Sequence, residues 1–353
     1  MAQTKEVPIA NLYYLLAYAW DHFVEGDEVD IAAWHCPDIH NLLAWALSNG
    51  IRRLASRGMD KSYLSVSETT PGLRGRILVA ESYRRFANRS GQMRCEFDEL
   101  SADTLANQIL RTTCDRLLNC DLITAAIRTE VRTAQKMLGD ITPVAIIGRS
   151  FERIQLHRNN RHYRFLLHIC RMLFDTLLPE ENTGQNRFHD ILRDETRMPQ
   201  LFEKFVLNFA RRHCKGAKVY SERIEWHGEW NENVAEVLPT MLTDVSIEYQ
   251  DRRTILDCKF YREALVTRHN RHRLHANHLY QLNAYLQNKS RIPGWEGVEG
   301  VLLYPAVEHS LDLSLNLLGH SVRIFSIDLD QQWHVIEQQL YRILGQTSEL
   351  IES

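Results

Sequence analysis

The sequence lacks the cysteine patterns that mark disulfide-stabilised, zinc-binding or iron–sulfur proteins. Among 353 residues there are seven cysteines, an odd number, and no two of them form a C-x-x-C pair. They occupy positions 36, 95, 114, 120, 170, 214 and 258. These spacings argue against a disulfide framework, a zinc ribbon and an iron–sulfur clasp. We therefore expect a reduced, cytoplasmic protein.

The sequence also lacks an apolar run long enough to cross a membrane, which takes about 20 residues. The uncharged N-terminal run, residues 7–20, is shorter than this. Residues 17–19 read Ala-Tyr-Ala and are similar to a signal cleavage site, so secretion is the alternative. After Pro8, however, apolar residues such as Ile9 and Leu12 fall at helical spacing. We expect an amphipathic core helix and no membrane association.

Excess positive charge is absent as well, because the formal net charge is −3. Any nucleic-acid binding must therefore come from a local basic surface or from a partner. The basic residues are 34 arginines and only 8 lysines. Arginine suits bidentate contacts with phosphate, although a GC-rich genome produces the same bias.

Internal repeats, low-complexity tracts and long Gly/Ser linkers are missing too, so the domain boundaries are not marked by composition. The length predicts two or three domains, and 44% apolar residues suffice for their cores. We expect a mixed N-terminal domain over residues 1–165 and a second domain over 166–353. Helical spacing after the first helix predicts helices at 39–57, 80–88, 101–118, 201–212, 274–287 and 331–344. Alternation predicts strands at 61–68, 93–100, 219–226, 241–249, 253–260, 300–304 and 322–327. The second domain is therefore expected to have a mixed α/β fold, a central sheet flanked by helices.

The strongest chemical signal is Thr-Asp-Val around Asp244, followed by Ile-Leu-Asp-Cys-Lys ending at Lys259. Residues i and i+2 of a strand share a face, so Asp257 and Lys259 are expected to point the same way. Asp244 reaches the same place if its strand pairs with the next across a short turn at 249–252. Two carboxylates and an ammonium would then converge.

Such a set suits hydrolysis of a phosphodiester. Asp244, Asp257 and the backbone carbonyl of Cys258 are hard oxygen ligands for Mg²⁺. The metal polarises the phosphate and lowers the pKa of water, and Lys259 steadies the attacking water and the developing charge.

The spacing D-x(12)-D-x-K is weak by itself, because Asp257 paired with Arg252 or Arg262 on a surface would look the same. The context strengthens it, because a predicted helix follows with Gln281 and Tyr285 at i and i+4, on one face.

A set of six residues resembles the RecB-type branch of the PD-(D/E)xK nucleases: Glu203 (in Leu-Phe-Glu-Lys-Phe-Val), Asp244, Asp257, Lys259, Gln281 and Tyr285. In that branch an N-terminal helix supplies a glutamate and a Q-x-x-x-Y helix flanks the metal site. The resemblance implies that Glu203 is an outer acidic residue, that Gln281 orients a ligand or contacts phosphate, and that Tyr285 supports it.

Further motifs narrow the resemblance. The opening VPIANLYYLLAYAW, the loop PGLRGRI and the segment LSADTLANQIL, with Asp244, Asp257 and Lys259, resemble the McrC family. These are nuclease subunits of McrBC modification-dependent restriction systems. The resemblance implies a partner, an McrB-like AAA+ GTPase ring that recognises modified cytosine in double-stranded DNA. The N-terminal domain would contact the ring and stimulate its GTPase. The sequence has no G-x-x-x-x-G-K-[ST] loop, so we expect no nucleotide bound by this chain itself.

Two basic segments are candidates for contacts. Arg74 and Arg76, in a turn marked by Pro-Gly and Gly, are candidates for contact with the ring, the alternative being an ordinary basic turn. Between residues 267 and 278, histidines recur at every third position. A zinc site there lacks a carboxylate at a suitable spacing. We interpret this segment either as a mobile basic loop beside the active site, which touches DNA phosphate through Arg268, Arg271 and His272, or as a simple solvated segment.

Two other functions remain possible on the sequence. One is a free-standing RecB-like nuclease. The other is a non-catalytic adaptor that regulates an AAA+ ring, although an intact Asp244, Asp257 and Lys259 argues against a relic site.

Overall fold

The chain divides into two compact units in the computed structural model. One unit combines Met1–Cys36 with Phe188–Ser353, and the other is Pro37–Arg187. The structure describes residues 7–20, 36–86, 92–156, 160, 162–176, 197–230, 234, 237–260, 265–268, 271–306 and 310–345.

The first helix, α1 (Ile9–Ala19), belongs to the unit that holds the C-terminal half, which corrects the expected division at residue 165. The side-chain amide of Asn11 donates to the carbonyl oxygen of Leu329 at 2.8 Å. The ring of Tyr14 stacks on Trp333 with centroids 4.2 Å apart. The apolar face of α1 is therefore buried against a distant part of the sequence, which a helical pattern alone does not identify.

The other unit is built on helices whose apolar faces pack together. They are α2 (Ile39–Arg57), α4 (Leu105–Leu118), α5 (Ala125–Met137), α6 (Gly148–Glu152) and α7 (Tyr163–Thr176). The predicted helix 39–57 is confirmed, and Asp38 caps it by accepting from the Asn41 amide. Because α7 packs against α2 and α4, this unit extends beyond residue 165.

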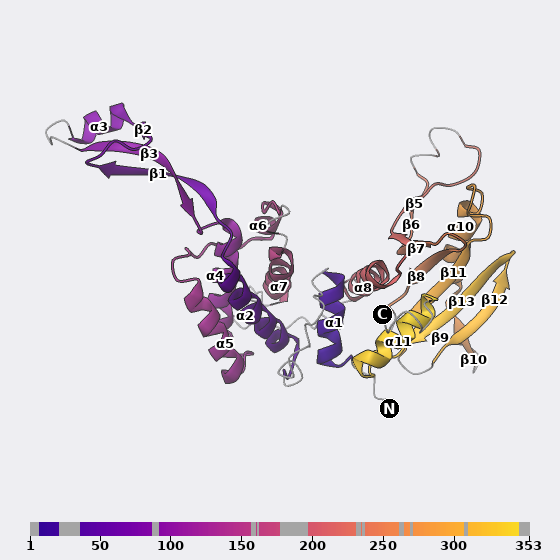
Figure 1. Ribbon diagram of the computed structural model, residues 1–353. Coiled ribbons are helices and arrows are strands. Elements are labelled where there is room, and N and C mark those ends of the chain that lie inside the picture. Colours follow the sequence, from indigo (N-terminus) through magenta and orange to yellow (C-terminus); the bar gives the residue numbers. More distant parts are fainter. Residues whose placement is uncertain are drawn as a thin grey trace. The chain divides into compact units, whose positions relative to one another are not determined.

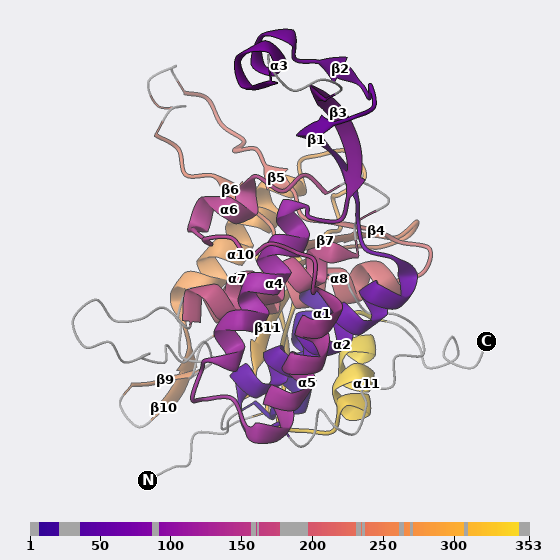
Figure 2. The ribbon, with the colours of Figure 1, turned by 90° about the vertical axis from the view of Figure 1, so that its left-hand side faces the viewer.

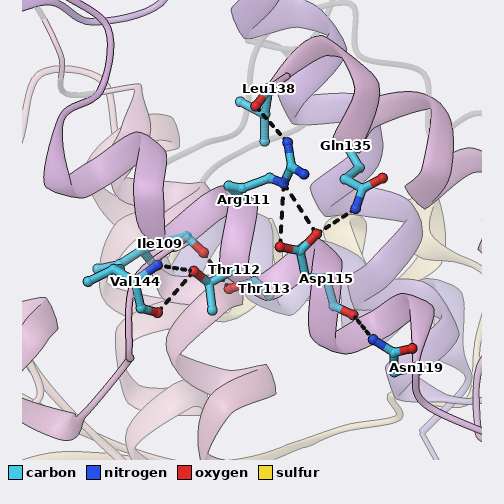
Figure 3. A network of polar contacts seen from close by, with 9 residues as sticks. All are labelled: Ile109, Arg111, Thr112, Thr113, Asp115, Asn119, Gln135, Leu138 and Val144. Carbon is cyan, nitrogen blue, oxygen red and sulfur yellow. Dashed lines mark hydrogen bonds and ion pairs between the residues drawn. The ribbon is translucent and has the colours of Figure 1, made fainter. Parts of the chain in front are cut away.

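A polar network ties α4 to the end of α5 (Figure 3). Arg111 donates to Asp115 at 3.2 Å and to the Leu138 carbonyl at 2.9 Å. Asp115 also accepts from the side chain of Gln135 at 2.5 Å. These contacts satisfy partly buried polar groups and fix how the two helices meet.

A small sheet stands away from these helices within the same unit (Figure 1). Its antiparallel order is β1 (Ser62–Thr70), β3 (Met93–Ser101), β2 (Arg76–Ile77), with α3 (Val79–Phe86) after β2. At its base, the Asn107 side chain donates to the carbonyls of Asp60 and Ala102, at 3.1 and 2.7 Å. One asparagine thus holds the chain where it enters and where it leaves the sheet.

The unit that contains α1 is built around a mixed six-stranded sheet, as expected. Its strand order is β12-β13-β11-β8-β7-β4. β8, β11 and β13 run parallel, and the remaining neighbours are antiparallel. The strands are β4 (Lys218–Tyr220), β7 (Val245–Glu248), β8 (Arg253–Cys258), β11 (Glu299–Pro305), β12 (Asp312–Leu317) and β13 (His320–Ile327). Edge strand β12 was not predicted, although its leucines alternate with polar residues.

Helices cover both faces of this sheet. They are α8 (Arg197–His213), α10 (Ala276–Lys289) and α11 (Trp333–Ile343). Figure 2 shows α10 and α11 on opposite sides of β11. A Cβ added at Gly300 of β11 would lie 2.9 Å from Leu286 of α10, so this glycine lets α10 lie close to the sheet.

Two pairs of short strands lie outside this sheet, and the first pair corrects the expected strands at 219–226 and 241–249. The strands expected at 219–226 and 241–249 are each interrupted, and β5 (Arg223–Ile224) pairs with β6 (Met241–Leu242) in a separate sheet. The chain bends between the two sheets, which alternation does not reveal.

Part of the segment expected as a loop pairs antiparallel, as β9 (Leu265–Arg268) and β10 (Arg271–Leu274). Leu, Val and Thr in β9 favour extended backbone. The side chains of the candidate DNA contacts Arg268, Arg271 and His272 lie outside the described residues. Among the helices that the structure describes, none is long and apolar enough to cross a bilayer.

Candidate active site

Asp257 and Lys259 meet at the end of β8, as predicted. Asp257 is only 1% exposed, and the Lys259 ammonium lies 2.8 Å from its Oδ2. The Lys259 amide donates to the carbonyl of Leu303 at 2.9 Å, which extends the pairing with β11 beyond the last residue of the strand. The two side chains therefore share a face, and Cys258 is buried on the opposite one.

Asp244 reaches the same place from the neighbouring strand. β7 and β8 pair antiparallel, and the amide of Tyr249 closes the predicted turn by donating to the Arg252 carbonyl at 2.9 Å. The register pairs Val245 with Leu256, so Asp244 lies opposite Asp257. Its Oδ2 accepts from the Cys258 amide at 2.7 Å.

Burial sets the electrostatics of this cluster. Burial first, and then the Asp257 and Glu203 carboxyls, raise the pKa of Asp244. Burial also raises the pKa of Asp257, against the opposing effect of Lys259. Burial lowers the pKa of Lys259, but the carboxylates of Asp257 and Asp244 together outweigh it, so the pKa is raised and the side chain is held as an ammonium. Two carboxyls that resist ionisation together are suited to hold a cation.

Glu203, on α8, faces this pair. The pKa of Glu203 is raised, first by burial; the charge of Lys259 lowers it and the carboxyl of Asp257 raises it. The Glu203 carboxyl is therefore close enough to interact with both groups. The sequence places Glu203 in the site only through the resemblance, because nothing local indicates which face of α8 meets β8.

Gln281 and Tyr285 lie one turn apart on α10, as predicted. The Gln281 amide donates to the Tyr285 hydroxyl at 2.6 Å. Burial raises the pKa of Tyr285, the Gln281 hydrogen bond lowers it, and the carboxyls of Asp257 and Asp244 raise it again. The helix therefore presents this pair toward the carboxylates.

His278, the last of the recurring histidines, lies near the site on α10 and not in a loop. It is buried on α10, and its Nδ1 is 2.9 Å from the Tyr304 hydroxyl. Burial and then the Lys259 charge lower the pKa of His278 to about 4. Its spacing of three from Gln281 and seven from Tyr285 is the signal for a shared helix face. The ring of His275 stacks on it, with centroids 4.8 Å apart.

The donor set fits Mg²⁺. Neither oxygen of the buried Asp257 carboxylate has a hydrogen-bond partner in the described residues, apart from the Lys259 ion pair. Among the residues that the structure describes, no group of three or more His, Cys, Asp or Glu side chains is placed to hold a metal ion by side chains alone. Two carboxylates with a backbone carbonyl suit Mg²⁺, which keeps several water ligands, and do not suit a closed zinc site.

A sequence profile described as "McrBC 5-methylcytosine restriction system component" matches residues 3–305. The chain belongs to this McrBC family.

Relatives of the McrBC family agree with this assignment along nearly the whole chain. The type IV methyl-directed restriction enzyme EcoKMcrBC of Escherichia coli strain K12 is 29% identical over 341 residues, covering 96% of this chain and 98% of the relative. A solved structure is described as the refined half-complex from a tetradecameric assembly of Thermococcus gammatolerans McrB AAA+ hexamers with bound McrC. It matches with a TM-score of 0.57 at 17% identity, covering 96% of this chain and 75% of that chain. This likeness shows an McrC-like fold.

Of the two candidate ring contacts in this McrBC-family chain, Arg74 lies between β1 and β2 of the small sheet, and Arg76 is the first residue of β2. The Arg74 guanidinium lies over the ring of Phe97, 4.1 Å from its centroid. Arg76 is exposed, 3.9 Å from a carboxylate oxygen of Glu96. Such exposed contacts are weak and leave both arginines available to a partner.

The raised pKa of Asp244 gives a testable pH dependence of stability. Burial raises the pKa of Asp244 from its ordinary value of 3.8 to about 8, so the stability contributed by the protonated carboxyl is lost as the pH rises through this window. Without metal, the wild-type chain should therefore lose thermal stability from pH 6 to pH 8 relative to Asp244→Asn. Each 1 kcal/mol lost should lower Tm by about 2–4 °C in scanning calorimetry.

If the site holds Mg²⁺, the ion would bind the ionised carboxylates, so its addition should raise the wild-type Tm more at pH 8 than at pH 6. Parallel pH profiles for wild type and Asp244→Asn would contradict the assignment of this carboxyl.

Proposed function

We propose that this chain is the Mg²⁺-dependent DNA endonuclease subunit of a methylcytosine-dependent restriction complex. In this proposal it has a PD-(D/E)xK nuclease core, and GTP hydrolysis by an McrB-like AAA+ ring drives cleavage. The observation that carries the proposal is the convergence of Asp244, Asp257 and Lys259 at the ends of two paired strands. Membership of the McrBC family supports the choice of substrate.

Each site residue has a role that its position suits. Asp244, Asp257 and the Cys258 carbonyl would hold Mg²⁺, which supplies Lewis-acid activation of the phosphodiester. Lys259 steadies the attacking water and the charge that develops on phosphate. Glu203 adds an outer acidic group, and the Gln281–Tyr285 pair orients a ligand or contacts phosphate.

The partner is inferred from the family and from what the sequence lacks. The solved structure of similar fold contains McrB AAA+ hexamers with bound McrC. This sequence has no G-x-x-x-x-G-K-[ST] loop for nucleotide phosphates. GTP hydrolysis therefore belongs to the partner in our proposal, as does recognition of the modified base, and the small sheet with Arg74 and Arg76 contacts the ring.

Cleavage of cytosine-methylated plasmid tests the proposal. The full chain is mixed with its McrB-like partner, Mg²⁺ and GTP, and reactions lacking one component run beside it. We expect cutting only in the complete mixture.

The two alternative functions give different results in the same assay. Cutting without the partner and GTP would indicate a free-standing RecB-like nuclease. Stimulated GTP hydrolysis without any cutting would indicate a non-catalytic adaptor of the ring.

Arg74→Ala should reduce stimulation of the partner's GTPase by about tenfold or more, since a buried charged contact contributes a few kcal/mol at an interface. The fold should change little, because the exposed cation–π contact with Phe97 contributes only about 0.5–1 kcal/mol. GTP hydrolysis and Tm are measured together. Arg132→Ala, on exposed helix surface of α5, is the matched control. Normal stimulation by Arg74→Ala would remove the role proposed for this turn.

A further inference from the structure

The residue before Asp244 lies where strand pairing does not hold the chain. β6 ends at Leu242 and β7 begins at Val245, so residues 243 and 244 form the passage from the two-stranded sheet to the six-stranded one. Asp244 nevertheless keeps its carboxylate 2.7 Å from the Cys258 amide. Other contacts must therefore fix the backbone at this bend.

Thr243 provides these contacts. It is 1% exposed, and its amide donates to the Glu222 carbonyl at 2.9 Å. Its own carbonyl accepts from the Ser221 hydroxyl at 2.6 Å. Its hydroxyl oxygen accepts from the Glu222 amide at 3.1 Å and lies 3.0 Å from the hydroxyl of Ser246. All polar groups of Thr243 are thus engaged, with Ser221 and Glu222 on one side and β7 on the other.

Glu222, which bonds Thr243, is itself held in place by a side-chain contact. The carboxylate of Glu222 is 2.5 Å from the ammonium of Lys289, which is buried at the end of α10. The same ammonium lies 4.2 Å from the centroid of the Trp295 ring. Thr243 is therefore bonded to a fixed backbone, and movement of Glu222 would require breaking a largely buried ion pair.

We propose that Thr243 is a positioning residue of the metal site, whose hydroxyl holds the bend that aims Asp244 at the metal. The inference rests on the proposed function, since it concerns how the chain binds Mg²⁺. A threonine hydroxyl accepts from Glu222 and still has a proton to donate, whereas valine has the same shape and does neither. Residues that orient a metal ligand commonly affect metal affinity about 10–100-fold.

This role is tested by measuring the affinity of the full chain for Mn²⁺. Binding is monitored by electron paramagnetic resonance, without DNA or partner. Mn²⁺ takes the same oxygen ligands as Mg²⁺. Thr243→Val should bind Mn²⁺ at least about tenfold more weakly than wild type. Thr243→Ser, which keeps the hydroxyl, should restore binding to within about twofold. Ser246→Ala removes the hydroxyl that contacts the hydroxyl of Thr243, so this variant should also bind Mn²⁺ more weakly.

Thr254→Val is the matched control, because Thr254 is buried in the same sheet on the face of β8 opposite Asp257. It should bind Mn²⁺ like wild type, and circular dichroism should show all variants folded. Wild-type binding by Thr243→Val, with Asp244→Asn defective, would overturn the positioning role of Thr243 and leave the metal site standing. Wild-type binding by Asp244→Asn would overturn the metal site and the proposed function with it.

Discussion

Asp257→Asn is expected to yield a folded chain that cleaves methylated plasmid at least about 10³-fold more slowly, because a metal that stabilises transition-state charge contributes several kcal/mol. Asp257 is 1% exposed, and Asp244 lies opposite it. Asparagine keeps the shape of aspartate and an oxygen that can accept from the Lys259 ammonium, so the metal-free chain should stay folded although the ion pair is lost. Initial cleavage rates with partner and GTP are measured beside Tm.

Asp251→Asn is the control, since it makes the same chemical change at an exposed residue in the turn between β7 and β8. It should cut like wild type, and both variants should assemble with the ring and support its GTPase. Asp257→Ala should be equally inactive, but it leaves the Lys259 ammonium facing a gap. Failure of Asp257→Asn to fold or to join the ring would show that this carboxyl is structural.

The sequence predicts this site well where it depends on local geometry. Alternation through β8 places Asp257 and Lys259 on one face, and a short turn brings Asp244 opposite. Both statements need only the two-residue period of a strand and a tight turn, and the structure confirms both. The Gln281–Tyr285 pair follows similarly from the helical period.

Burial of the site was not predictable from the same patterns. A charged residue in a strand usually faces solvent, so alternation alone does not indicate that Asp257 is buried. The structure buries it, since α8 and α10 both pack against β8. The placement of α1 has the same cause, because amphipathicity shows that a helix buries one face but not what covers it.

The bend at Thr243 shows a third limit. Residues 241–249 alternate well enough to suggest one strand, yet the chain changes sheets there. The hydrogen bonds that hold the bend come from residues about 20 positions earlier in the sequence, at Ser221 and Glu222. A local pattern carries no information on such partners.

Lys259→Met should lower the cleavage rate by about 10²–10³, the loss seen when one preorganised donor is removed from a transition state. Lys259 is 13% exposed and held 2.8 Å from Asp257, so its charge is fixed in a site with little water. In the proposed mechanism the role of Lys259 is electrostatic rather than metal-binding. Mn²⁺ binding should therefore be unchanged or tighter, because a competing cation has been removed, and this separates Lys259 from the carboxylates.

Lys218→Met, on exposed β4, is the matched control and should keep full activity. Lys259→Arg should not restore the rate, since a planar guanidinium does not occupy the place of a compact ammonium. A Lys259→Met chain that cuts within about tenfold of wild type would mean that the ammonium only neutralises Asp257 in the resting fold. Weakened Mn²⁺ binding would instead mean that Lys259 holds the carboxylates in position. Only a slow variant with intact metal binding places the lysine charge on the reacting phosphate.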